Sequence, residues 1–445
     1  MENKLKVVFR AELADDNRVF LALAGLILVA LIFGGAPNTM GWRLMLTTFV
    51  SAVSLASFIA WGNFANVKRM PRLVLVWLGL TVAIPLLQLV PLPPALWQSL
   101  PGREHAITVV SVIGADSAWR PLTLDPVQTK ISLLALLPAL AIFIGSVSLD
   151  KHQRVRLLQL VALSGVVSIA VGVFQVTSRG AWLNFYDTQH DIFLLGFFSN
   201  RNHAALLITS ALLIATWLVW ETRSSDRNKR ALTIVLIIFA LGPLLATFSR
   251  AGIGFYALSV VVILRTAFPQ IRKIKSAWWL AGIVGLVLAS VLVVTLSDTA
   301  SRSLARFAAI EEDSRWDIWR VSWGLVKQYW PAGSGLGGFV PLYAQVEPLA
   351  LLQPRFVNHA HNDYLEVVIE AGVLGLIAIA GVWVVVAKTG HMLLKGANKR
   401  YHLLLLVPVL TLLHSTIDYP LRTSAISCIA TLCLAHCIAS LLKSD

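Results

Sequence analysis

Apolar runs of about 20 residues recur along nearly the whole of this 445-residue chain. A helix needs roughly 20 apolar residues to cross the hydrocarbon core of a bilayer. We identify twelve such runs, near residues 19–36, 44–62, 73–92, 131–148, 157–176, 203–220, 231–248, 252–268, 277–297, 363–387, 401–417 and 423–442. The pattern predicts an all-α polytopic membrane protein with about twelve transmembrane helices. The first run is expected to stay as an uncleaved anchor.

Charge distribution supports this interpretation and predicts an orientation. Only 13% of the residues are charged, against roughly 25% in an average soluble domain, which argues against a soluble enzyme. The net charge of +14 would suggest a nucleic-acid partner in a soluble protein, but the basic residues lie in short clusters between apolar runs. Because Lys and Arg favour cytoplasmic connections, both termini are predicted to be cytoplasmic. Membrane lipids, and no nucleic acid, are the expected partners of these residues.

Two external segments are long, 93–128 and 298–361, and a third, 177–202, is of moderate length. Because a structureless loop of about 60 residues is unusual, residues 298–361 are expected to carry their own helices and the chemistry. The predicted organisation is a single integral membrane domain. It has helices 1–9 in residues 1–297, the catalytic loop in 298–361, and helices 10–12 in 362–445.

A histidine-rich segment, Asn358-His-Ala-His-Asn-Asp-Tyr-Leu-Glu366, joins this loop to the tenth run. Asp363 is a plausible N-cap with Glu366 three residues later, so His361 would lie just before a helix N-terminus. The positive end of the helix disfavours imidazolium and would keep His361 neutral, as a general base must be. Metal binding by His359 and His361 is a rival use, and a purely structural role is the third.

Glu366 and Glu370 are four residues apart on one face of the tenth run. An ionisable residue inside a membrane helix is costly and is interpreted as functional by default. A buried ion pair that orders the bundle explains the two glutamates equally well.

Four arginines are predicted at external helix ends: Arg201, Arg250, Arg315 and Arg422. A guanidinium group offers a planar fork that can hold phosphate bidentately, so several at one membrane depth suit a lipid-linked phosphate or pyrophosphate. For each arginine the alternative is a headgroup contact or a structural ion pair. Arg250 lies in a tight turn that leaves it little freedom to move away from a site.

The long loop also contains a tryptophan series and a glycine cluster. Trp316, Trp319, Trp323 and Trp330 fall on one face of a helix, which would lie in the membrane interface as an anchor or offer a ring for sugar stacking. Residues 333–338 match G-x-G-x-x-G, but they follow no strand, so a tight turn is expected there and not a dinucleotide site.

Motifs for several other functions are missing from the external segments. There is no Walker A motif, D-x-D pair, G-x-S-x-G or H-E-x-x-H in them. Three cysteines, Cys428, Cys433 and Cys437, lie in one apolar run without metal-ligand spacing, which supports neither a disulfide framework nor a zinc site.

Taken together, these motifs resemble the O-antigen ligase and O-antigen polymerase superfamily, which shares the Wzy-C region. The likeness runs over roughly residues 195–425. It is carried by Gly196-Phe-Phe-Ser-Asn-Arg-Asn-His-Ala204, Thr247-Phe-Ser-Arg-Ala-Gly252, Arg315-Trp-Asp-Ile-Trp319, Pro331 to Phe339, His359 to Gly375, and His414-Ser-Thr-Ile-Asp-Tyr-Pro-Leu-Arg422.

The resemblance implies a GT-C-like fold and an inverting, metal-independent glycosyltransferase of the bacterial inner membrane that needs no cofactor. Its donor would be an O-antigen glycan on undecaprenyl pyrophosphate, and its acceptor a terminal sugar of lipid A core, both on the periplasmic side. His361 would be the base, although His359 is a rival, while Arg250 and Arg315 stabilise the departing pyrophosphate. The expected substrate-binding residues are Arg201, His359, Asn362, Glu366, Asp418 and Arg422.

Polymerases and protein O-oligosaccharyltransferases share these motifs, so the acceptor is not fixed by them. We favour the ligase because the external loop is compact and the chain ends soon after the last apolar run. A transporter or flippase is the alternative from another class. It would place charged or broken helices near the bilayer midplane in both halves, whereas the distinctive polar residues here gather at external ends.

Overall fold

The computed structural model describes residues 15–37, 41–186, 192–270, 315–352, 356–396 and 399–442. Within these ranges the chain is almost entirely helical, as the apolar runs predicted. The exception is a two-stranded antiparallel sheet in which β1 (Pro91–Leu92) pairs with β2 (Arg120–Pro121).

The long helices form one bundle. In chain order they are α2 (Asp15–Phe33), α3 (Trp42–Trp61), α5 (Arg72–Gln88), α8 (Pro126–Ser148), α9 (Lys151–Thr177), α10 (Arg201–Glu221), α11 (Asp226–Ala246), α12 (Arg250–Ala267), α16 (Asp363–Lys395), α17 (His402–His414) and α18 (Ser424–Ala439). Shorter helical pieces are α4 (Phe64–Lys68), α6 (Pro94–Gln98), α7 (Glu104–Val112), α15 (Phe339–Val346), η2 (Leu349–Leu351), η3 (Lys399–Tyr401) and η4 (Pro420–Arg422).

In the described part of the chain, seven helices are long and apolar enough to cross a membrane, namely α3, α8 to α12 and α16. Four shorter apolar helices lie within or coincide with α2, α5, α17 and α18. These helices coincide with every expected run except the ninth, residues 277–297, which lies outside the described residues. A multi-pass membrane protein is supported, while the number twelve stays a prediction.

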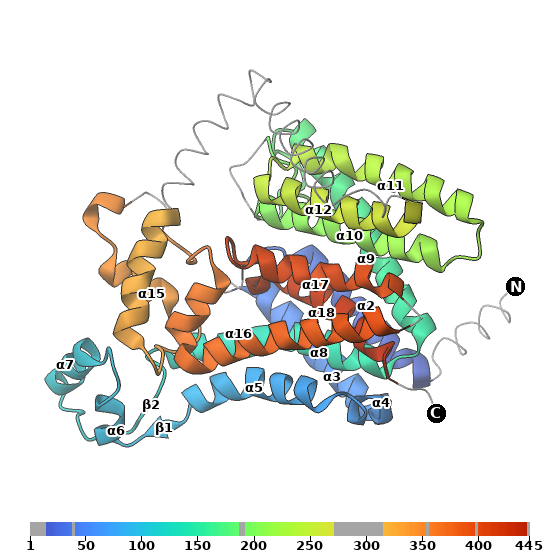
Figure 1. Ribbon diagram of the computed structural model, residues 1–445. Helices are drawn as coiled ribbons and strands as arrows, with labels where there is room; N and C mark the ends of the chain where they lie inside the picture. Colours follow the sequence, from blue (N-terminus) through green and yellow to red (C-terminus); the bar gives the residue numbers. More distant parts are fainter. Residues whose placement is uncertain are drawn as a thin grey trace, which may run out of the picture.

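Helix α10 is the centre of one half of the bundle, where it packs against α9, α11, α12 and α17. Most of its apolar window, 83%, is buried inside the protein, against 22% for α3 and for α11, which lie at the periphery. The other half is formed by α2, α3, α5, α8, α16 and α18 (Figure 1).

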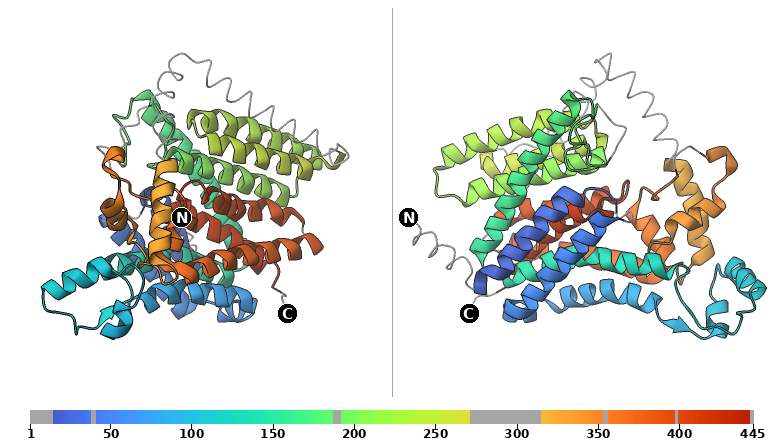
Figure 2. Two further views of the ribbon diagram at one scale, coloured as in Figure 1. Left: turned by 60° about the vertical axis from the view of Figure 1, so that its left-hand side comes forward. Right: turned by 180° about the vertical axis from the view of Figure 1, so that it is seen from behind.

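The predicted external segments meet at one end of the bundle. There α6 and α7 lie near α15, beside the start of α16 (Figure 1). Residues 315–329 are helical, so the long loop does carry helices of its own, as expected, although residues 298–314 lie outside the described ranges. Helix α2 begins and α18 ends at the opposite end of the bundle, which agrees with termini on one common side (Figures 1 and 2).

Helix α16 is kinked at Gly372, whose φ of 54° is in the left-handed region. The glycine-rich turn that follows the helix at 315–329 docks into this kink. Backbone N–H groups of Ser334 and Gly335 donate to the carbonyls of Ile369 (3.1 Å) and Glu370 (2.8 Å). The predicted tight turn is thereby confirmed, and it attaches the helix at 315–329 to α16.

Gly372→Ala is expected to destabilise the protein by roughly 1–3 kcal/mol, because alanine tolerates this backbone conformation poorly. An added Cβ would also lie 2.0 Å from the carbonyl oxygen of Pro331. The matched control is Gly254→Ala in α12, where nothing lies within 4 Å of the new methyl group. The thermal midpoint of unfolding in detergent should fall for the first variant only; equal midpoints would contradict the docking role.

Candidate active site

The site is organised around the His359-Ala-His361 turn at the start of α16. His361 has a φ of 49°, an uncommon conformation for a residue with a side chain. Such conformations cost free energy and persist where surrounding contacts enforce them, often at functional sites.

Three contacts fix this turn. The carbonyl of Ala360 accepts a hydrogen bond from Trp319 Nε1 at 2.9 Å. The backbone N–H of Ala360 donates to Glu366 Oε2 at 2.9 Å. His359 Nδ1 lies 3.0 Å from Glu366 Oε1. Both backbone groups of Ala360 are thus satisfied by side chains, and the orientation of each histidine follows from the fixed backbone between them.

The N-cap prediction for Asp363 was wrong by one residue. Asn362 is the N-cap, with its Oδ1 accepting from the N–H groups of Tyr364 (3.1 Å) and Leu365 (3.0 Å). Asp363 is instead the buried first residue of α16, where its Oδ2 accepts from Ser415 Oγ at 2.9 Å. With the N-cap at Asn362, Glu366 is the fourth residue of the helix and not the third, so it forms no capping box, and its carboxylate contacts the histidine turn. His361 does precede the helix N-terminus, as expected.

His361 faces Asp418, a carboxylate with no solvent exposure. His361 Nδ1 lies 3.6 Å from Asp418 Oδ1, and the rings of His203 and His414 approach the same carboxylate at 4.0 and 3.8 Å. Asn202 donates to Asp418 Oδ2 at 2.7 Å. Burial alone would raise the pKa of Asp418, but the contact with His361 and the facing imidazoles lower it well below its ordinary value.

Asp418 therefore remains ionised and favours the proton on the Nδ1 of His361. That tautomer leaves Nε2 as the nitrogen able to accept a proton. His359 has a different partner, Glu366, and the two imidazoles lie against Tyr419 with ring centroids 4.5 and 5.0 Å away. The structure thus gives the two histidines of the motif different environments.

A hydrogen-bonded chain links Asp418 to the turn that carries Arg250. Asn202, which donates to Asp418, accepts at Oδ1 from Ser249 Oγ at 2.7 Å. Ser249 is the N-cap of α12, and Arg250 is the first residue of that helix, with an exposed side chain. The preceding residue, Phe248, has a φ of 53°, so this turn too adopts a left-handed conformation.

The other two arginines assigned to the donor also lie at this end. Arg201 begins α10, directly after the N-cap Asn200, and its guanidinium lies over the Phe193 ring at 4.8 Å. Arg315 begins the described part of the helix at 315–329. It lies one helical turn before Trp319, whose indole N–H donates to Ala360 in the histidine turn.

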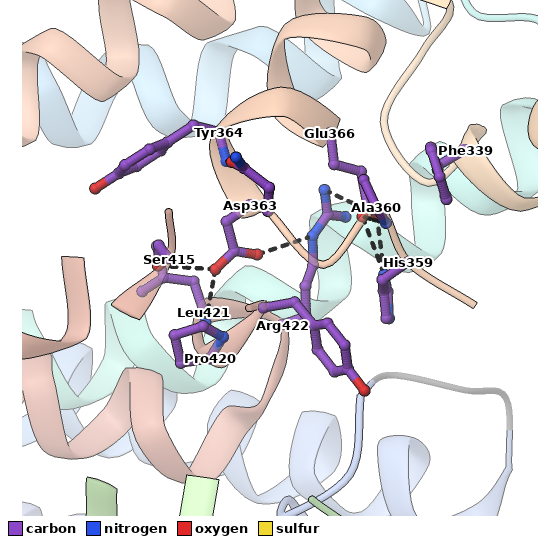
Figure 3. Close-up of polar contacts among 12 residues, drawn as sticks. Phe339, His359, Ala360, Asp363, Tyr364, Glu366, Ser415, Pro420, Leu421 and Arg422 are labelled. Carbon is purple, nitrogen blue, oxygen red and sulfur yellow. Dashed lines mark hydrogen bonds and ion pairs between the residues drawn. The ribbon is translucent and has the colours of Figure 1, made fainter. Parts of the chain in front are cut away.

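Arg422 has a different environment, in which it is enclosed by carboxylates (Figure 3). Its Nη2 lies 2.9 Å from Glu370 Oε2 and 3.3 Å from Glu366 Oε1, and its Nε lies 3.7 Å from Asp363 Oδ1. Burial lowers the pKa of Arg422, but the three carboxylates raise it overall. This arrangement supports the alternative in which Glu366 and Glu370 form a buried ion cluster that orders the bundle.

The tryptophan series does not share one exposed face. Trp316, Trp323 and Trp330 are exposed, at 66%, 55% and 43%. Trp319 instead turns inward, because its indole N–H is used by the Ala360 carbonyl. The sequence spacing could not separate this residue from its neighbours.

Several residues of the site were not identified as candidates from the sequence: Asn200, Asn202, His203, His414 and Tyr419. Asn200 and Asn202 flank Arg201 in a motif that carried the family resemblance, and His414 lies one helical turn before Asp418. Their roles depend on contacts between α10 and the segment after α17, which no local spacing reveals. Among the described residues, no group of three or more His, Cys, Asp or Glu could hold a metal ion. The three cysteines of α18 are buried free thiols.

A comparison with protein families finds a match to the model described as O-antigen ligase, over residues 234–380. The match includes Arg250, Arg315 and His361. Asp418 and Arg201 lie beyond its limits. A search of curated proteins finds no match to the chain. The family match supports the O-antigen ligase and polymerase superfamily that the motifs resembled.

Proposed function

We propose that this member of the O-antigen ligase superfamily transfers O-antigen polysaccharide from undecaprenyl pyrophosphate to a terminal sugar of lipid A core. The family match supports the coarser statement, a ligase- or polymerase-type activity in a multi-pass membrane protein. The observation that carries the proposal is the His361–Asp418 pair at the end of the bundle that also holds Arg201, Arg250 and Arg315. We place this end in the periplasm of the bacterial inner membrane and both termini in the cytoplasm.

The proposed reaction is a single inverting displacement. The acceptor hydroxyl attacks the anomeric carbon of the donor glycan and transfers its proton to His361 Nε2. Asp418 stabilises the imidazolium that forms, because its carboxylate faces the Nδ1 of the same ring. General-base assistance of this kind contributes about 10² to 10⁴ in rate.

The leaving group is the lipid pyrophosphate, which gains negative charge as the glycosidic C–O bond breaks. Arg315 and Arg250 are proposed to stabilise that charge, with Arg201 as a further contact to the donor. The N-termini of α10 and α12 lie next to each other, as the Ser249–Asn202 bond shows, and their partial positive charge favours an anion at the same place. The proposed mechanism uses these groups to stabilise charge and requires no metal.

The other residues that were expected to contact the substrates have more limited roles in the proposed mechanism. Arg422 is balanced by three carboxylates, so we assign it to ordering the site and not to the pyrophosphate. Asn362 caps α16 through its Oδ1, and Glu366 holds the histidine turn. His359 is proposed to contact the acceptor and to leave proton transfer to His361.

The decisive experiment is transfer by the purified, reconstituted protein, with lipid-linked glycan supplied in the presence and absence of lipid A core. We expect glycan on lipid A core, formed equally well with a divalent-metal chelator present. Elongation of the lipid-linked glycan without the core acceptor would instead identify a polymerase. Glycan attached only to an added protein acceptor would identify an oligosaccharyltransferase, and translocation with no covalent product a transporter. An absolute metal requirement would contradict the mechanism.

A further inference from the structure

A cavity of about 730 Å³ opens between α5, α8, α16, α17 and α18. Its walls are largely apolar, and small residues on two of the lining helices leave the space free. These are Ala135 and Ala139 on α8, and Ala371, Gly375 and Ala378 on α16. Within each helix they recur at intervals of three or four residues and so share a face.

The cavity is elongated along the bundle. Its lining residues on α16 run from Asp363, at the first turn, to Val382, nineteen residues further. These residues cover about five helical turns, on both sides of the kink at Gly372. The space is therefore suited to a polar group at one end with a hydrocarbon chain beyond it, and less to a compact polar ligand.

The polar end of the cavity lies beside the histidine turn. His359, Asp363, Glu366, Glu370 and Arg422 all line it there. Figure 3 shows the contacts of Arg422 with Asp363 and Glu366. One guanidinium faces three carboxylates, so this end disfavours a pyrophosphate group, whereas carboxylates accept hydrogen bonds readily from sugar hydroxyls. Of the described residues that line the cavity, none is Arg201, Arg250 or Arg315.

Inversion requires the nucleophile to approach the anomeric carbon from the side opposite the leaving group. His359 is on the cavity wall, whereas His361 faces Asp418, and the Tyr419 ring contacts both imidazoles. An acceptor that enters from the cavity would reach His361 past His359 and Tyr419. The pyrophosphate would then depart among the arginines, which the cavity does not include.

We propose that this cavity binds a hydrocarbon chain of the acceptor glycolipid, with its hydroxyl-bearing headgroup against Glu366 and Asp363. This inference rests on the proposed function, because it assigns the acceptor and the donor to separate sites. It predicts that the acceptor lipid contributes to recognition within the membrane as well as through its terminal sugar.

The test compares two alanine-to-phenylalanine changes in α16. Ala378→Phe places a ring in the cavity, whereas Ala380→Phe places the same ring on the exposed surface two residues away. Lipid A core is the probe, and its binding to the full-length protein is measured by native mass spectrometry, without donor. Ala378→Phe should weaken binding by about tenfold or more, as expected when a pocket loses room for a hydrocarbon group. Ala380→Phe should bind like the unmodified protein.

A transfer assay supplies the second readout. Ala378→Phe should raise the KM for lipid A core. The KM for the lipid-linked donor should stay unchanged, and so should the rate of transfer to a deacylated core oligosaccharide. A raised KM for the donor would assign the cavity to the polyprenyl chain and overturn the proposal. Unaltered binding of lipid A core would also overturn it. Because binding is measured without turnover, its loss in Ala378→Phe supports the cavity assignment even if the proposed transfer reaction is not observed.

Discussion

Replacing His361 with alanine is expected to lower the rate of glycan transfer by about 10²- to 10⁴-fold, the usual contribution of a general base. The side chain is 21% exposed, so it is accessible to an acceptor hydroxyl while its Nδ1 faces Asp418. The measurement is kcat with saturating lipid-linked donor and lipid A core. Because the variant also removes a partner of the buried Asp418 carboxylate, a lower thermal midpoint of unfolding is expected, and kcat is measured well below that midpoint.

His359→Ala is the matched control, since it removes the other imidazole of the same turn. It deletes the contact with Glu366 and should lower the unfolding midpoint while retaining much more of kcat than His361→Ala. Full activity of His361→Ala together with an inactive, folded His359→Ala would reassign the base to His359. The two variants therefore resolve the ambiguity that the His-x-His motif leaves in the sequence.

The pKa of Asp418 determines the pH range in which His361→Ala and His359→Ala can be compared. Its pKa in the folded protein lies below that of the unfolded chain. Its charge therefore stabilises the fold above the unfolded value, about 3.9, and this contribution is lost only as the pH falls through the still lower folded value. Above the unfolded value Asp418 therefore stays ionised, and the kcat of the two variants can be compared there without any contribution from titration of Asp418.

The membrane helices could be predicted from the sequence because their signal is local. Each depends on a run of apolar residues with the length of a bilayer core, and only one expected run, 277–297, lies outside the described residues. The turn at Gly333 was equally predictable, since glycine density within a few residues indicates a tight turn. These features need no knowledge of which helices are neighbours.

The connections within the site could not be predicted in this way. Asp418 is separated by 57 residues from His361 and by 216 from Asn202, and these residues meet because both α10 and α16 pack against α17. The contacts of Arg422 could not be predicted from the sequence either. Its position at a predicted external turn suggested a phosphate contact, but folding encloses it in three carboxylates of α16. Residue type and depth indicated the end of the bundle at which these side chains lie, whereas their pairing leads us to propose Arg201, Arg250 and Arg315, and not Arg422, as contacts to the donor.

Arg315→Ala is expected to lower kcat by about 10²- to 10³-fold, comparable to the loss of one donor that stabilises a developing negative charge. The physical reason is that, in the proposed mechanism, the pyrophosphate gains negative charge in the transition state and Arg315 stabilises that charge. Arg320→Ala is the control on the same helix, because Arg320 is 80% exposed and contacts only Asp317 among the ion pairs of the described residues. That variant should retain normal kcat and an unchanged KM for the donor.

Arg315→Lys distinguishes the charge of the guanidinium group from its planar, forked shape. Lysine keeps the positive charge but loses the planar fork, so partial activity would indicate charge stabilisation and near-complete loss would indicate bidentate contact with phosphate. An Arg315→Ala enzyme with normal kcat and a higher KM for the donor would mean that Arg315 binds ground and transition states equally well. In that case Arg250, at the N-terminus of α12 and linked to Asp418 through Ser249 and Asn202, would be left to stabilise the leaving group.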